Sequence, residues 1–194
     1  MILDFACQDT RKLFLTGHSE RFRSIEGTAL RRLDLIQCAC SVNDLRRCPS
    51  LCAPEGESCI VDASDGWNMC FIWEGSSVRG LRLMQKNTKA KTAKTLPFMD
   101  AERIVSHPGA ILREEFMRPL KLSSNQISIA ISVPVSRMLD IVNERRGISS
   151  DTAARLSQYL GVSARLWTSL QAEYELSVVR QDKQELLSSI KRYA

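Results

Sequence analysis

Several residues in the second half of the chain have the types and spacing needed to contact DNA. Arg137 lies near the start of a short predicted helix, and an arginine there can bridge O6 and N7 of guanine in the major groove. Serine and asparagine side chains, with the free N–H groups of the preceding helix, can contact phosphates. The candidate DNA-contacting residues are Ser123, Ser124, Asn125, Val135, Ser136, Arg137, Arg145 and Arg146.

These side chains need two short helices joined by a tight turn to position them. Ser123 is expected to cap the first helix, and Ser132-Val133 forms a turn before a second helix whose first residue is Pro134. Such a pair is typical of helix-turn-helix proteins, whose second helix enters the major groove. The apolar periodicity predicts an all-α, five-helix helix-turn-helix domain over 99–194. Its helices are expected over 109–118, 124–131, from 134 to before 147 and over 152–160, with one or two more over 164–191.

The first half of the chain mixes helical and extended patterns. Apolar spacing predicts helices over 9–17 and 25–39, the first of them between a cap at Asp9 and a stop at Gly17. Turn residues then separate three extended segments, which predicts an antiparallel meander. Residues 1–85 are therefore expected to form an α+β domain of two helices and a small antiparallel sheet. The strand candidates are 59–61, 67–73 and 78–84.

Residues 86–98, between the two halves, are polar and cationic and contain four lysines. Such a stretch buries too little apolar surface to offset the entropy lost on ordering, so it is expected to be a linker. Met99 follows it, where a separately translated second protein would begin. This position suggests that two neighbouring genes have been joined into one chain.

Composition excludes several classes of protein. The 194 residues are 44% hydrophobic and 25% charged, which is typical of a chain that buries a core, and the length allows one large domain or two small ones. The sequence contains no run of about 18 apolar residues, so no membrane-spanning helix is predicted. The first residues lack a secretory signal, so a cytoplasmic protein is expected. The net charge of +5 does not by itself imply nucleic-acid binding.

All seven cysteines lie within the first 70 residues. Their odd number and the lack of an export signal argue against a disulfide framework. The pairs Cys38-x-Cys40 and Cys48-x3-Cys52 differ from the C-x2-C spacing of zinc sites, and neither histidine of the chain lies near them. Free thiols are expected, with no metal site and no cofactor.

Three segments of the second half resemble the HigA-type antitoxins. They are 107–120, which begins His-Pro-Gly, 145–156, which begins Arg-Arg-Gly, and 166–176, which begins Leu-Trp. The resemblance covers nearly all of 99–180. It implies a fold like that of phage repressors, a homodimer, and repression of the protein's own operon through an inverted-repeat operator.

Two residues depart from that family pattern. Ser128 stands where the family usually has alanine, and Ser132 where it usually has glycine. Ser128 places a hydroxyl where two helices press together, and Ser132 lacks the freedom of glycine in a turn. Each of the two serines is expected to lower the stability of the folded domain by about 0.5–1 kcal/mol.

The toxin gene precedes the antitoxin gene in such operons, and the first half is similar to HigB toxins of the RelE-like ribonucleases. The similarity spans about residues 2–85 and implies ribosome-dependent mRNA cleavage. In such enzymes basic, His and Tyr side chains orient the 2′-hydroxyl and stabilise the phosphorane. The residues that carry the similarity are Phe5, 10–14, 31–35, 44–46 and 67–73.

The catalytic residues that this resemblance implies are missing. Asn68 stands where the family has a basic residue after the strand tryptophan, and a second basic position falls near Val61 or Asp62. Residues 83–85 replace the usual Asp-Tyr-His ending of the last strand. The toxin-like half is expected to be inactive. The residual catalytic candidates are Arg79, Arg82 and Lys86.

Together these features predict a fused toxin–antitoxin chain that binds operator DNA as a homodimer and represses its own promoter. The toxin-like half is expected to pack against an antitoxin half, within one chain or across the dimer. One alternative is a ribosome-dependent mRNA endoribonuclease that its fused antitoxin neutralises in cis. The other is an antitoxin that neutralises a separately encoded toxin by protein contact.

Overall fold

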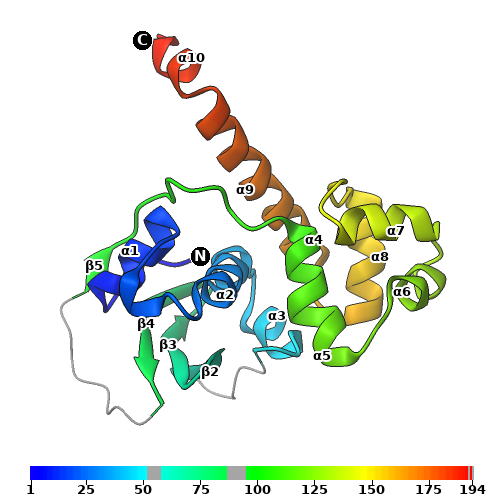
Figure 1. Ribbon diagram of the computed structural model, residues 1–194, viewed down its shortest axis with the longest axis horizontal. Helices are drawn as coiled ribbons and strands as arrows, with labels where there is room; N and C mark the ends of the chain where they lie inside the picture. The colour runs from blue at the N-terminus through cyan, green and yellow to red at the C-terminus, as the bar shows by residue number, and fades with distance from the viewer. Residues whose placement is uncertain (52–57, 87–94, 192, 194) are drawn as a thin grey trace.

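The computed structural model describes residues 1–51, 58–86, 95–191 and 193 (Figure 1). The N-terminal half combines helices with a sheet, and the C-terminal half is helical, as the sequence predicts. In Figure 1 the sheet lies at one side of the molecule, the short C-terminal helices lie at the other, and one long helix projects beyond both.

Three strands form the predicted antiparallel meander: β2 (Ser58–Ser64), β3 (Trp67–Glu74) and β4 (Ser77–Gln85). Buried and exposed side chains alternate along β2, so the sheet has one buried and one outer face. The turn between β2 and β3 contains Gly66 at a φ of 80°. This left-handed conformation is the one that the Asp-Gly signal predicts.

The sheet has two further strands that the hydrophobic pattern does not reveal. β1 (Asp4–Phe5) pairs in parallel with β4, and β5 (Leu96–Pro97) pairs antiparallel with β1. The strand order is β2-β3-β4-β1-β5, so the expectation of a purely antiparallel sheet is wrong: the sheet is mixed. Two-residue strands are too short to show alternation. β5 falls within the expected linker 86–98, of which 87–94 lie outside the described residues.

Helices α1 (Gln8–Thr16) and α2 (Glu26–Cys38) pack on the buried face of the sheet. α1 ends at Gly17, whose φ of 78° provides the predicted left-handed stop. The predicted cap at Asp9 is wrong, because Cys7 is the N-cap residue and Asp9 lies in the first turn. The spacing of the apolar residues predicts that this helix forms, whereas its first residue depends on where β1 ends.

Two short elements in this half were not predicted. A 3₁₀ turn spans Glu20–Phe22, and α3 spans Val42–Arg47. α3 begins with a capping box, in which the side chains of Ser41 and Asp44 accept hydrogen bonds from each other's backbone N–H groups. A helix of six residues is too short to display a helical apolar period.

The C-terminal half contains the predicted helical segments, shifted by a few residues. Residues 108–120 form one continuous helix, and α7 begins at Val135 with Pro134 as its N-cap rather than its first residue. Lys183 divides the last predicted helix in two. The helices are α4 (Pro108–Ile111), a π-helical turn (Leu112–Met117), α5 (Arg118–Leu120), α6 (Ser124–Ala130), α7 (Val135–Val142), α8 (Ser150–Leu160), α9 (Ala164–Asp182) and α10 (Gln184–Ser189).

Helix α4 crosses α7 closely because residue 109 has no side chain. A Cβ on Gly109 would lie 1.8 Å from the carbonyl oxygen of Ile141. His107 is the N-cap residue of α4, and its Nδ1 accepts a hydrogen bond of 3.0 Å from the Gly109 N–H. The His107 ring also packs edge-on against Tyr174 of α9, with 4.7 Å between centroids. The start of α4 thus joins α7 to α9.

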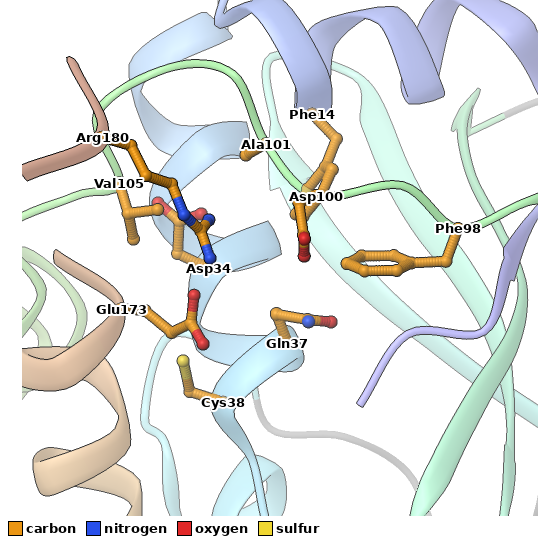
Figure 2. Close-up of a pocket in the computed structure, with 10 residues that line it drawn as sticks. All are labelled: Phe14, Asp34, Gln37, Cys38, Phe98, Asp100, Ala101, Val105, Glu173 and Arg180. Carbon is orange, nitrogen blue, oxygen red and sulfur yellow. The ribbon is translucent and has the colours of Figure 1, made fainter. Parts of the chain in front are cut away.

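The two halves meet where α2 packs against α4 and α9. A cavity of about 20 Å³, enough for about one water molecule, lies between them (Figure 2). Its lining includes Asp34 and Cys38 of α2 and Glu173 and Arg180 of α9. Burial raises the pKa of the Cys38 thiol well above its usual value, so this sulfur stays protonated. The cavity is too small for a substrate.

Two buried carboxylates of the N-terminal half are bound by the C-terminal part of the chain. Asp34, 2% exposed, accepts hydrogen bonds from the Arg103 guanidinium and, at 2.9 Å, from the Ser106 N–H. Asp44, 1% exposed, accepts from the Ser163 N–H at 2.7 Å and from the Ser163 hydroxyl at 3.0 Å. Ser163 is the N-cap residue of α9, so Asp44 ties the start of α9 to α3.

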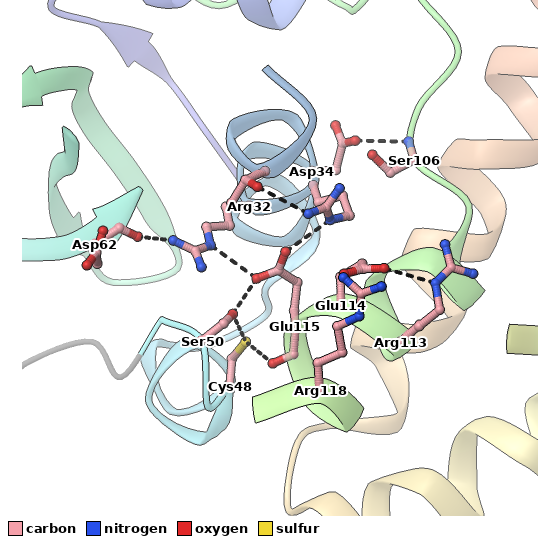
Figure 3. A network of polar contacts seen from close by, with 12 residues as sticks. Arg32, Asp34, Cys48, Ser50, Asp62, Ser106, Arg113, Glu114, Glu115 and Arg118 are labelled. Atoms are coloured by element: carbon pink, nitrogen blue, oxygen red, sulfur yellow. Dashed lines mark hydrogen bonds and ion pairs between the residues drawn. The ribbon is translucent and has the colours of Figure 1, made fainter. Parts of the chain in front are cut away.

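A third buried carboxylate belongs to the C-terminal half and is bound by the N-terminal half (Figure 3). Glu115, 1% exposed, pairs through its two oxygens with the Nε atoms of Arg31 and Arg32, each at 3.1 Å, and accepts a hydrogen bond from the Ser50 hydroxyl. All three partners come from the N-terminal half. The carbonyl of Glu115 also accepts a 3.7 Å contact from the Cys48 thiol, whose pKa burial raises to about 11.

Replacing Glu115 by glutamine is expected to lower the free energy of unfolding by about 1–3 kcal/mol, because two arginines lose their buried counter-charge. Urea denaturation followed by tryptophan fluorescence measures the change. Glu114→Gln is the matched control, since Glu114 pairs only with Arg113 and Arg118 of its own half among the described residues. Equal effects of the two substitutions would contradict a dominant role for Glu115.

The buried His107 predicts a pH dependence of stability. Burial lowers the pKa of His107 below its usual value of 6.5. As the pH falls below about 6.5, the unfolded chain takes up this proton first, so stability present above that pH is lost as the pH falls through the folded-state value. His107→Asn keeps a capping side chain and removes this contribution. Urea denaturation at about pH 5 and about pH 7.5 should show a smaller pH difference for the variant.

Candidate nucleic-acid interface

Helices α6 and α7 pack together and are joined by a turn in a left-handed conformation. Ser132 in this turn has a φ of 54°, and the Val133 N–H donates a 3.0 Å hydrogen bond to the Ser128 carbonyl. A left-handed φ is costly for any residue but glycine, so the substitution noted at Ser132 carries its expected strain. Ser128 is buried, and its hydroxyl donates to the Asn125 carbonyl at 2.8 Å, so the added polar group is satisfied.

The start of α6 holds three of the candidate DNA-contacting residues. Ser123 is its N-cap: the Ser123 Oγ accepts from the Gln126 N–H at 3.2 Å, and the Gln126 Oε1 accepts from the Ser123 N–H at 2.8 Å. Its hydroxyl therefore already caps the helix. Asn125 is exposed, and Ser124 is half-buried beside it.

Helix α7 buries one side and exposes the other. Met138, Ile141 and Val142 are buried in the core, whereas Val135 and Ser136 are exposed at the start of the helix. Both candidate residues therefore lie on the exposed side of α7. Leu139, 43% exposed on the same helix, lies outside the predicted set.

Arg137 lies at the edge of this exposed side rather than at its centre. Its guanidinium is 3.6 Å from a carboxylate oxygen of Asp151 in α8. Asp151 also pairs with Arg155 at 3.0 Å, and Arg155 donates to the Ile131 carbonyl at 3.1 Å. This chain of contacts links Arg137 to the turn between α6 and α7. The i,i+4 spacing of Asp151 and Arg155 is a sequence signal for their own pair, but no local spacing reveals the contact between Arg137 and Asp151.

Arg145 and Arg146 are exposed in the turn that follows α7. Their backbone N–H groups both donate to the Asp140 carbonyl, at 2.8 and 3.2 Å, which fixes the turn at the end of the helix. The Arg145 side chain lies 3.5 Å from the Asp140 carboxylate. Two cations are therefore held beside the end of α7.

The cationic candidates of the N-terminal half lie on strand β4 and just after it. Arg79 pairs with Glu74 at 3.2 Å, and Lys86 pairs with Asp62 at 2.9 Å. Hydrogen bonding by the Ser64 N–H, followed by Lys86, lowers the pKa of Asp62. Arg82 is half-buried and faces Cys70 across the β3–β4 pair. Arg79 and Lys86 thus each have a carboxylate partner.

No group of three or more His, Cys, Asp or Glu side chains among the described residues is placed to hold a metal ion, and Cys52 of the predicted cluster lies outside those residues. Within the same ranges, no helix is both long and apolar enough to cross a bilayer.

Comparison with known proteins identifies relatives of the C-terminal half. No family model matches the chain. Virulence-associated protein I of Dichelobacter nodosus is 42% identical over 92 residues, which make up 47% of this chain and 85% of that protein. The match covers less than half of this chain and lies in its C-terminal half.

Two solved structures resemble the same half. A HigA-family addiction module antidote protein from Coxiella burnetii is 32% identical and matches 47% of this chain and 99% of its own, with a TM-score of 0.44. The Pseudomonas aeruginosa antitoxin HigA, solved with the higBA promoter, is 37% identical and matches 46% of this chain and 98% of its own, also at 0.44. Virulence-associated protein I is 42% identical to this chain, and the match covers 85% of that protein. The chain therefore belongs through its C-terminal half to the family of Virulence-associated protein I, and this half is similar in sequence to antitoxins of the HigA family.

Proposed function

We propose that the chain is a sequence-specific DNA-binding repressor of its own promoter. One observation carries this proposal: α6 and α7 lie on the far side of α4 and α9 from the sheet (Figure 1), so the packed N-terminal half leaves the exposed side of α7 open. The relatives support it, since one similar structure holds a HigA antitoxin with its promoter and another holds a protein with its operator DNA.

In this proposal Arg137 reads a base, while Arg145 and Arg146 bind phosphates beside it. The 3.6 Å pair with Asp151 is partly exposed, so it costs little to exchange for a guanine contact. Val135 and Ser136 lie one turn of helix or less from Arg137 and complete the reading surface. The operator is an inverted repeat, which two copies of α7 contact.

We further propose that the N-terminal half is a RelE-type toxin fold without ribonuclease activity, held in cis by the C-terminal half. Two features of the sequence support its inactivity. Asn68 supplies no charge where the resemblance places a basic residue, and residues 83–85 replace the usual Asp-Tyr-His ending of the last strand. A phosphorane needs charged and proton-donating side chains to stabilise its negative charge.

Arg137→Ala is expected to weaken binding to promoter DNA by about 1–3 kcal/mol and to relax sequence preference at one position. Fluorescence anisotropy of the full chain on promoter and scrambled DNA, at several salt concentrations, measures both effects. Arg146→Ala should weaken binding to both DNAs alike and lower the salt dependence. Arg23→Ala, an exposed arginine of the N-terminal half, is the control and should leave binding unchanged.

Weak, salt-sensitive binding that ignores sequence would overturn the repressor function. In that case, co-purification with a separately encoded toxin would support an antitoxin that acts by protein contact alone.

The full chain is expected to leave mRNA intact on translating ribosomes, because the N-terminal half lacks a usable set of catalytic cations. Primer extension on mRNA from a translation reaction would detect any cut. Site-specific cleavage that disappears in Arg82→Ala would instead establish an active ribonuclease.

A further inference from the structure

The exposed side of α7 carries an apolar side chain that the proposed DNA contacts do not use. Leu139 is 43% exposed, although leucine is among the residues that proteins most often bury. Ser136 and Asn143, three residues before it and four after it, are exposed on the same side of the helix. Leu139 therefore lies at the centre of the exposed side, whereas Arg137 lies at its edge.

A second apolar side chain lies next to Leu139 on the same helix. Val135, 40% exposed, precedes it by four residues, and side chains at this spacing are neighbours on a helix surface. We call Val135 and Leu139 the apolar pair. Neither side chain has a hydrogen-bond donor or acceptor. A ligand group that lies against the apolar pair must itself be apolar, because a polar group there would lose its bonds to water without replacement.

The packing of α7 holds the apolar pair outward. Met138 and Ile141 are fully buried on the other side of the helix. α4 approaches α7 so closely there that a Cβ on Gly109 would lie 1.8 Å from the Ile141 carbonyl oxygen. The Asn143 N–H donates to the Leu139 carbonyl at 2.9 Å, so the helix is regular through Leu139. A rotation of α7 that buried Leu139 would expose Met138 and Ile141 and break the approach to α4.

The charges around the apolar pair favour DNA as the occupant. Arg137, Arg145 and Arg146 border it on α7 and in the turn that follows. The carboxylates nearest to these arginines are paired with them, since Asp140 lies 3.5 Å from Arg145 and Asp151 lies 3.6 Å from Arg137. An apolar contact bordered by cations matches a polyanion that presents an apolar group between its charges. In the major groove of DNA that group is the C5-methyl of thymine.

We propose that Leu139 reads the 5-methyl group of an operator thymine, with Val135 against a neighbouring base. The inference rests on the proposed function and adds a specificity-determining residue to it. Four residues of helix rise by about 6 Å, and successive bases of one strand are about 3.4 Å apart. The apolar pair therefore contacts bases that are about two steps apart.

Deoxyuridine tests this contact, because it differs from thymidine only in lacking the methyl group. Each thymine of the promoter fragment is replaced in turn, and fluorescence anisotropy of the full chain gives the dissociation constant. At the contacted thymine the constant should rise about fourfold, which is the value of burying one methyl-sized group. Cytosine at that position should also bind weakly, and 5-methylcytosine should recover a similar factor because it restores the methyl.

Variants of Leu139 connect the methyl to this side chain. With Leu139→Ala, thymine and deoxyuridine at the contacted position should bind within about 1.5-fold of each other, because the partner of the methyl is gone. Leu139→Gln can instead bond N6 and N7 of adenine, so it should also ignore the methyl. Leu186→Ala is the matched control: this leucine is exposed on α10, at the end of the projecting helix (Figure 1), and its variant should keep the wild-type ratio.

The outcomes separate this inference from the proposed function. Binding that prefers the promoter to scrambled DNA but ignores the methyl at every thymine would overturn the role of Leu139 and leave the repressor in place. A wild-type ratio in Leu139→Ala would overturn it too, because another side chain would then read the methyl. Promoter binding unaffected by both Leu139 variants would assign the apolar pair to contact with a protein. A chain that binds scrambled DNA as tightly as its promoter would refute the proposed function itself.

Discussion

The buried carboxylate of Glu115 is the contact on which the arrangement of the two halves most depends. A charge so deeply buried is tolerated only when it is paired and hydrogen-bonded, and its partners Arg31, Arg32 and Ser50 all belong to the other half. Asp34 and Asp44 are buried and bound across the same contact. Because any sliding of one half would separate three carboxylates from their donors, a single relative placement is favoured.

That placement determines which surfaces remain available. α9 contributes one side to the core and to α2, while its outer row of apolar residues stays exposed. α4 stands between the N-terminal half and α7, and its close approach to α7 at Gly109 keeps the helix-turn-helix pair compact. The N-terminal half therefore occupies the inner side of the C-terminal half, and the exposed side of α7 and the projecting helix are left open.

The helix-turn-helix unit itself depends on short-range constraints. The turn requires a left-handed residue, and here the serine at 132 takes that conformation while Arg155 binds the neighbouring Ile131 carbonyl. The same arginine connects to Arg137 through Asp151. In the N-terminal half, Arg79 and Lys86 likewise pair with carboxylates, those of Glu74 and Asp62. The helix-turn-helix pair is thus held by the geometry of its turn and by a short chain of ion pairs.

Helices α1 and α2, the helical segments of the C-terminal half, the β2–β4 meander and the exposed position of Val135 and Ser136 follow from the sequence alone, because each depends on a local period of apolar residues or on turn chemistry. β1, β5 and α3 could not be predicted, since elements of two to six residues have no measurable period and the two strands pair with distant segments. The Asp151 partner of Arg137 also required the structure. So did the role of Glu115, which the sequence presents as one of two adjacent acids on a helix: only tertiary packing decides that one is buried against two arginines while the other pairs within its own half.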